Sequence, residues 1–248
     1  MNRNISCQAL VLRARALGDS NREVWLLGAE TGPVRATVFG GPKSRLRAYA
    51  SPFHSGRVWI YHNPVKDSRK LADFDVVSWR PGLREMYERA MAADAVARVV
   101  LASHGGGGDW EGALALAEGA LDVLALADVE LCQRALLWFF WRWADFLGIR
   151  PEFERCSLCE RPALPADALW FSLREGGALC RSCAGAAGGG GGLLEAGPGC
   201  RLWLRTAGLA HPSQIWRYTL DAKSFREAKA LTSALLSGIG HGKAALWE

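Results

Sequence analysis

The chain has 248 residues, of which half are hydrophobic and 22% are charged, a balance that excludes a disordered chain and is typical of globular domains. Its formal net charge of +5 is unevenly distributed, because residues 1–80 contain 13 Lys and Arg against 6 Asp and Glu, whereas residues 81–248 contain 17 against 19. We expect neither a secretory signal nor a membrane span, since the most apolar run, Ala135–Trp141, has seven residues and a spanning helix needs about 20.

The first third of the chain has the pattern of a small all-β domain. Val34, Ala36 and Val38 fall on one face of an expected strand, and Gly, Pro and Asn turn residues separate similar short runs. Five such strands predict a small barrel or a sandwich. The residues between the third and fourth strands, Gly40–Arg47, are expected to form a flexible basic loop. The expected strands are residues 6–13, 23–27, 34–39, 57–61 and 71–79.

The periodicity changes at Arg80–Gly82, which we interpret as a domain boundary. Helical spacing follows, and Gly148 is expected to end the third helix, while the glycine run 188–192 is expected to be a flexible loop. The expected helices are residues 83–103, 110–126, 129–147, 201–209 and 224–236. We therefore predict an all-β domain over residues 1–80 and an all-α domain over residues 81–248, with a small insert at about 153–186.

Four of the seven cysteines form two Cys-x-x-Cys pairs that are separated by 20 residues. Each pair presents two sulfurs from one tight turn, and a tetrahedral zinc ion needs four thiolates at about 2.3 Å. An iron–sulfur centre is the less common occupant of such a pattern. Four protein ligands leave no position for water, which argues for a structural role. We predict one structural Zn²⁺ held by Cys156, Cys159, Cys180 and Cys183.

The other three cysteines, Cys7, Cys132 and Cys200, are expected to be small buried residues. Most aromatic residues are also expected in the core, including the run Trp138–Phe146 in the third helix. In the first domain we assign the core to Trp25, Phe53, Trp59 and Phe74 and expect Tyr49 at the surface.

Cations are concentrated in the first domain, where they can bind nucleic-acid phosphates while interleaved aromatic rings stack on bases. A five-stranded barrel with a basic face is typical of an OB-fold that binds single-stranded nucleic acid. The same charges could instead form a solvated face without a partner. We predict a nucleic-acid-binding surface formed by Arg13, Arg15, Arg35, Lys43, Arg45, Arg47, Tyr49 and Arg57.

No catalytic constellation is recognisable in the sequence. The five histidines are scattered without a His-Glu-x-x-His motif, and a Lys-x-Asp-Gly motif is absent. The glycine runs at 105–108 and 188–192 lack the strand before and the helix after that a phosphate-binding loop requires. We therefore expect a protein without enzymatic activity.

Several short motifs occur in an order that spans nearly the whole chain. They are Ala9–Leu12 followed by Leu17–Asn21, Phe39–Arg45 followed by Pro52-Phe53, Trp141-Arg142 followed by Phe146–Pro151, and the two cysteine pairs with Gly176–Cys180 ahead of the second. In content and order they resemble the RecO family of bacterial recombination mediators.

The resemblance implies an N-terminal OB domain followed by a helical domain with an inserted zinc finger. It also implies a DNA-repair protein that responds to DNA damage through recombination, binds single- and double-stranded DNA and anneals complementary strands. The implied partners are RecR, the C-terminal tail of the single-strand-binding protein SSB, held in the helical domain, and indirectly RecA. RecA would be loaded onto SSB-coated strands in the RecF pathway, in the cytoplasm at the nucleoid and away from membranes.

Two other interpretations stay open on the residues alone. One is an RNA-binding OB and zinc module of the translation apparatus, which competition between single-stranded DNA and RNA would separate from a DNA-binding protein. The other is a fragment of a DNA ligase, against which the absent Lys-x-Asp-Gly motif argues.

Overall fold

The structure, a computed structural model, describes residues 4–41, 43–187 and 192–238. Backbone contacts divide the chain into two compact units, one with the residues up to Cys132 and one with the residues from Gln133. The glycine run predicted as a flexible loop lies, apart from Gly192, outside the described residues. Within these described ranges, no helix combines the length and the apolar character that a membrane crossing requires.

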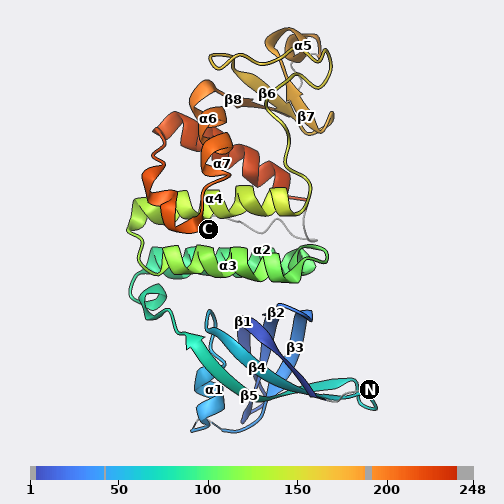
Figure 1. The fold of residues 1–248 in the computed structure, drawn as a ribbon, viewed down its shortest axis with the longest axis vertical. Helices are drawn as coiled ribbons and strands as arrows, with labels where there is room; N and C mark the ends of the chain where they lie inside the picture. Colours follow the sequence, from blue (N-terminus) through green and yellow to red (C-terminus); the bar gives the residue numbers. More distant parts are fainter. Residues whose placement is uncertain (1–3, 42, 188–191, 239–248) are drawn as a thin grey trace. The chain divides into compact units, whose positions relative to one another are not determined.

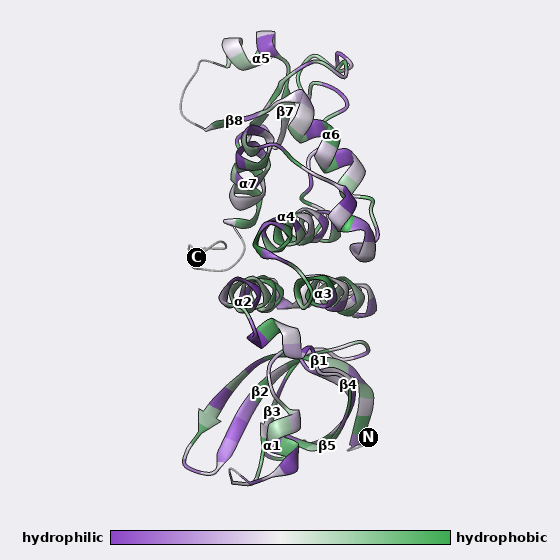
Figure 2. Ribbon diagram, turned by 90° about the vertical axis from the view of Figure 1, so that its left-hand side faces the viewer, coloured by the Kyte–Doolittle hydropathy of each residue, from purple (hydrophilic) through white to green (hydrophobic). Residues whose placement is uncertain are grey.

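The first five strands close into a barrel in the order β1-β2-β3-β5-β4 (Figure 1), which confirms the predicted OB-like barrel. Neighbouring strands pair antiparallel except β3 and β5, which meet in parallel at Thr37 and Lys70. The strands carry both hydrophilic and hydrophobic residues (Figure 2), and a cluster of buried hydrophobic side chains fills the barrel interior. The strands are β1 (Asn4–Leu17), β2 (Asn21–Gly28), β3 (Gly32–Val38), β4 (Ser55–Asn63) and β5 (Ser68–Ser78).

A short helix, α1 (Arg45–Tyr49), replaces part of the segment predicted as a flexible loop. The helix begins after Ser44, whose Oγ accepts a hydrogen bond from the backbone N–H of Arg47 at 3.4 Å. Leu46 and Tyr49 pack against the barrel core. Five residues are too few to show a helical hydrophobic period, which is why the sequence pattern did not predict this helix.

Two long helices complete the first unit and lie side by side (Figure 1). The helix α2 (Tyr87–Ala102) follows the short turn η1 (Pro81–Arg84), and α3 (Trp110–Leu124) follows η2 (His104–Gly106). Both helices contact the barrel. At one contact Trp110 lies against Gly32, where a Cβ atom would come within 2.5 Å of the indole ring, so only glycine permits this approach.

The helix α4 spans Val129–Phe146 in full, and its residues from Gln133 onward belong to the second unit. Its predicted burial is confirmed, because Trp138, Phe139, Phe140, Trp141 and Trp143 are each at most 3% exposed. The helix ends at Phe146, and Gly148 follows in the left-handed conformation with a φ of +70°, as expected for a residue that stops a helix. The other helical segments are α6 (Pro198–Ala207), η3 (Pro212–Arg217) and α7 (Ala222–Leu236).

A small three-stranded sheet is inserted between α4 and α6, which confirms the predicted insert in a helical region. Its strands pair antiparallel in the order β7-β6-β8, and α5 (Arg181–Ala186) follows β7. The last strand, β8, lies beyond the second cysteine pair and returns to pair with β6. The strands are β6 (Leu169–Ser172), β7 (Gly177–Leu179) and β8 (Leu193–Ala196).

Candidate nucleic-acid interface and metal site

The outer face of β1, β2 and β3 carries a row of three side chains in register. Arg13 on β1 is opposite Trp25 on β2, and Trp25 is opposite Arg35 on β3. The guanidinium carbons of Arg13 and Arg15 lie 5.9 and 5.0 Å from the centroid of the Trp25 ring. The partly exposed indole of Trp25 is therefore surrounded by three arginines that the sequence predicted to bind DNA. The ring can stack on a base while the arginines bind the neighbouring phosphates.

A single carboxylate organises this row. Glu23, whose side chain is 11% exposed, accepts a hydrogen bond from Nε of Arg15 at 2.7 Å and lies 3.3 Å from Nε of Arg35. The two arginines keep 58% and 64% of their side chains exposed, so their charges stay accessible. Glu23 thus fixes the positions of both arginines on either side of Trp25 but balances only one positive charge.

A second basic group lies on and before α1. Nε of Arg45 donates to the Tyr49 hydroxyl at 2.6 Å, and its guanidinium carbon lies 4.8 Å from the centroid of the Tyr49 ring. Nη1 of Arg47 donates to the Ser20 carbonyl in the turn between β1 and β2 at 3.1 Å. Lys43 precedes the helix and is exposed. These contacts hold Arg45, Arg47 and Tyr49 in fixed positions beside Lys43.

Arg57, the last predicted residue of this surface, lies in a different part of the barrel. It is on β4, in register with Gln8 on β1 and Asp75 on β5, and its Nε donates to the Ser6 hydroxyl at 3.0 Å. The eight predicted residues therefore form two groups, around Trp25 and around α1, with Arg57 separate.

The assignment of aromatic residues to the core is correct for Phe74 and wrong for Trp59. Phe74 is 1% exposed inside the barrel, whereas Trp59 on β4 is 37% exposed. Trp25 and Phe53 are partly buried. Tyr49, which was expected to be exposed, is also partly buried, because its ring packs against the barrel core and meets Trp79 edge-on at a centroid distance of 5.1 Å. Trp25 is thus a candidate binding residue that sequence analysis missed.

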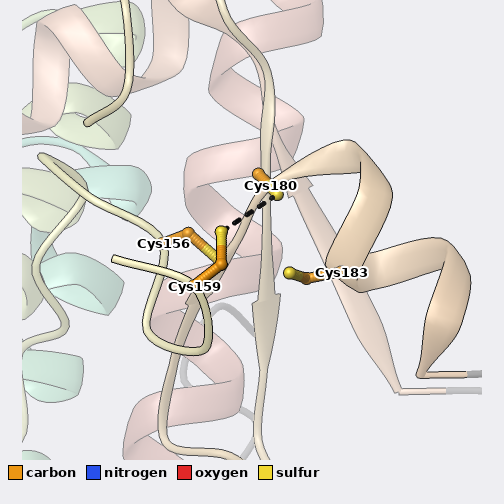
Figure 3. Close-up of side chains that lie close together, drawn as sticks. All are labelled: Cys156, Cys159, Cys180 and Cys183. Atoms are coloured by element: carbon orange, nitrogen blue, oxygen red, sulfur yellow. Dashed lines mark hydrogen bonds between the residues drawn. The ribbon is translucent and has the colours of Figure 1, made fainter. Parts of the chain in front are cut away.

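The four cysteines of the two Cys-x-x-Cys pairs come together at the edge of the small sheet (Figure 3). Their sulfurs all lie within 4.8 Å of one another, and Sγ of Cys159 is 3.8 Å from Sγ of Cys180. Thiolates at about 2.3 Å from a tetrahedral metal are about 3.8 Å apart. The observed spacing fits a four-cysteine metal site, and these residues could hold one metal ion.

The environment of the thiols also fits a cation. Burial raises the pKa of Cys156, but hydrogen bonds from the backbone N–H groups of Cys159, Cys180 and Leu158 outweigh it and lower this pKa to about 6. The backbone N–H of Cys183 likewise lowers the pKa of Cys180. Hydrogen bonds with the other three sulfurs raise the pKa of Cys183 to about 12. The site favours some thiolates, and a bound cation would supply the charge needed to ionise the rest.

The remaining cysteines, Cys7, Cys132 and Cys200, are buried as expected. Burial raises the pKa of Cys132 to about 11 and that of Cys200 to about 12, which keeps both thiols protonated near neutral pH.

The fold and these sites define a class of protein that joins an OB-like barrel to helices and a four-cysteine, zinc-finger-type insert. Comparison with known families agrees with this class. The model of the N-terminal domain of recombination protein O matches residues 1–79, and the model of its C-terminal domain matches residues 84–238. The chain therefore belongs to the RecO family.

Individual relatives carry the same name, DNA repair protein RecO. The protein of Pelotomaculum thermopropionicum is 34% identical over 177 residues, which are 71% of this chain and 66% of the relative. That of Desulfitobacterium hafniense is 29% identical over 71% of this chain and 63% of its own length. These two matches span just under two thirds of the relatives. The protein of Heliobacterium modesticaldum is 28% identical over 97% of this chain and 87% of its own length.

Proposed function

We propose that this protein is a recombination mediator that binds DNA and anneals complementary strands, without enzymatic activity of its own. It acts with RecR to load RecA onto SSB-coated single strands in the RecF pathway, in the cytoplasm at the nucleoid. The observation that carries the proposal is the row Arg13–Trp25–Arg35 on the outer face of the barrel. This row offers a stacking surface for a base together with cations for phosphates on both sides.

Annealing requires two negatively charged strands to approach each other. The barrel carries two basic groups, one around Trp25 and one on α1, and these can neutralise the phosphates of two strands at once. Lowering the repulsion between strands needs no bond to be made or broken, so no catalytic residues are needed. The same phosphate contacts can bind double-stranded DNA, whereas stacking on Trp25 favours strands with unpaired bases.

The four-cysteine cluster supports a structural role for one Zn²⁺ ion bound by Cys156, Cys159, Cys180 and Cys183. With four sulfur ligands the metal would have no open position, so it would hold the small sheet and α5 together without taking part in chemistry.

A cavity of about 750 Å³ in the second unit is the proposed site of the SSB tail. Trp141 and Phe153 line it with ring centroids 6.2 Å apart, and the guanidinium carbon of Arg150 lies 5.8 Å from the Trp141 ring. Arg205 and Leu202 line the cavity as well. Three arginines, Arg150, Arg201 and Arg205, outnumber the two glutamates Glu152 and Glu154 in the lining, and cations beside apolar walls suit an acidic peptide with apolar side chains.

Strand annealing measured with variants of each basic group tests the proposal. Replacing Lys43, Arg45 and Arg47 together by Gln, or Arg13 and Arg35 together, should each slow annealing at least tenfold and weaken binding to all DNA sequences alike. Arg226→Gln, which removes an exposed cation from α7, is the matched control and should change neither. Annealing that survives both multiple replacements would mean that another surface binds the strands.

Running the same assay on SSB-coated strands tests the mediator role separately. We expect annealing of coated strands, and we expect Arg150→Glu to abolish it while annealing of naked strands persists. Annealing of naked strands alone by the unmodified protein would leave DNA binding intact and contradict the mediator role. A preference for single-stranded RNA over DNA in competition would instead support an RNA-binding module.

A further inference from the structure

A cavity of about 390 Å³ opens beside α1, on the first unit and apart from the row around Trp25. Trp79, which is 42% exposed, forms one wall, and His54, Ser51 and Pro52 form another. Arg22 and Arg84 also line it. Its volume is in the range of about 300–1,000 Å³ that is usual for pockets that bind small ligands.

The residues that line this cavity carry a net positive charge, because two of them are arginines and none is acidic. Arg22 enters from the start of β2 and donates to the Arg47 carbonyl at 3.0 Å. Burial and the neighbouring charge of Arg47 both lower the pKa of Arg22, so an anion placed here would relieve repulsion between cations. Arg84 reaches the other side, where Nη2 donates to the Pro52 carbonyl at 3.1 Å.

The aromatic wall is held rigidly in place. The ring of Trp79 meets His54 at a centroid distance of 4.9 Å and Tyr49 at 5.1 Å, both edge-on. Edge-on contacts with two neighbouring rings fix the orientation of Trp79. An indole that is both fixed and 42% exposed can stack a planar ligand with little loss of side-chain freedom.

We infer that this cavity binds one nucleotide unit of a single strand, with the base against Trp79 and the phosphate between Arg22 and Arg84. The assignment rests on the proposed DNA-binding function and adds a site to it. Arg47 connects the two, since its backbone carbonyl accepts from Arg22 and its side chain belongs to the α1 basic group. A strand that crosses α1 would place one nucleotide in the cavity.

Binding of a 15-residue oligothymidylate and of an abasic strand of equal length, followed by fluorescence anisotropy, tests the stacking contact. Trp79→Leu should weaken binding of the intact strand about tenfold and leave the abasic strand unchanged, whereas Trp79→Phe should keep most of the affinity. Trp216→Leu is the matched control, because Trp216 is 57% exposed on η3 in the second unit, and it should bind as the unmodified protein does. Equal affinity of Trp79→Leu and the unmodified protein for the intact strand would overturn the inference.

Crosslinking of the unmodified protein keeps the inference testable if the Trp79 variants fail to fold. An oligonucleotide that contains 5-iodouridine should crosslink to Trp79 or its neighbours in the cavity, as identified by mass spectrometry. Crosslinks at Trp25 without any in the cavity would overturn the nucleotide site and leave the proposed function standing. Absence of strand binding altogether would contradict the proposed function itself.

The affinity of the protein for thymidine 5′-monophosphate shows whether the cavity binds part of a strand or a free nucleotide. We expect the monophosphate to bind no tighter than millimolar, because it lacks the contacts that the rest of the strand makes with α1. Micromolar binding that Trp79→Leu removes would overturn the assignment to a strand and identify the cavity as a site for a free nucleotide.

Discussion

Nε of Arg80 donates a hydrogen bond of 2.6 Å to the Asp122 carboxylate and ties the barrel, two residues after β5, to helix α3. The Arg80 side chain is 4% exposed, and its Nη1 also donates to the Phe53 carbonyl at 2.8 Å and to the Ser55 hydroxyl at 3.0 Å. One guanidinium therefore fixes the barrel end, the turn before β4 and a helix relative to one another.

Removing the anchor should destabilise the first unit. Arg80→Met removes the hydrogen bonds that the guanidinium donates to the Phe53 carbonyl and the Ser55 hydroxyl. We expect this change to lower the free energy of unfolding by about 3 kcal/mol. Asp122→Asn should cost about 1 kcal/mol, because the Asp122 side chain is 61% exposed and water can replace it. Urea denaturation of both variants measures the two losses, and equal small losses would show that the pair carries little stability.

The buried imidazole of His54 predicts a dependence of stability on pH. Nδ1 lies 2.9 Å from the Tyr49 carbonyl, which can only accept, so Nδ1 carries the proton and Nε2 accepts from Nη2 of Arg84 at 3.1 Å. Burial, together with the charges of Arg84 and Arg80, lowers the His54 pKa below its usual value of about 6.5. The folded protein therefore holds this ring in the neutral state.

Below pH 6.5 the unfolded chain gains a proton at His54 that the folded chain does not, so the stability contributed by the neutral ring is lost as the pH falls. We expect the free energy of unfolding to fall between pH 7.5 and 5.5, by at most about 1.4 kcal/mol per pH unit from this residue. His54→Gln, which can keep both hydrogen bonds, should reduce the slope. An unchanged slope in this variant would assign the pH dependence to other groups.

Metal removal should affect the small sheet and spare the barrel. Elemental analysis should find about one zinc per chain, and Cys180→Ser should bring it close to zero, whereas Cys132→Ala, a change at a buried cysteine outside the cluster, should keep it. Hydrogen exchange should accelerate in β6, β7 and β8 of the Cys180→Ser variant. Full zinc retention in that variant would contradict the four-cysteine assignment.

Loss of the Trp25 ring should weaken the binding of single-stranded DNA more than the binding of double-stranded DNA. Trp25→Leu keeps an apolar residue between Arg13 and Arg35 but removes the ring, so affinity for single strands should fall by about 1–3 kcal/mol. Binding of a duplex, which depends on phosphate contacts, should change much less. Parallel anisotropy titrations of both forms measure this difference, with Trp216→Leu as the control. Equal losses for the two forms would argue against stacking.

The features that the sequence predicted well depend on local spacing. The two Cys-x-x-Cys turns, the aromatic run of α4 and the stop at Gly148 each follow from residues within a few positions of one another. The strands of the barrel are also marked by their own alternation and turn residues. For these elements the neighbouring residues contain the information that determines the structure.

Trp25 shows why the binding face could not be predicted in the same way. Trp25 and Leu27 are two residues apart on β2 and share one side of the strand, yet Leu27 is fully buried and Trp25 is partly exposed. Gly105, from the segment after α2, lies against Leu27 and helps to bury it. The cavity beside α1 is similar, because its residues come from four separate segments that only the folded chain brings together.

The dependence of single-strand affinity on salt tests the central claim, binding through the basic face of the barrel, most directly. With about six phosphate contacts, a plot of the logarithm of the association constant against the logarithm of the salt concentration should have a slope of roughly −4. Replacing Lys43, Arg45 and Arg47 together by Gln should reduce the steepness by about two, at about 0.7 for each phosphate that the variant no longer neutralises. A flat plot for the unmodified protein, or the same slope in both proteins, would contradict the claim.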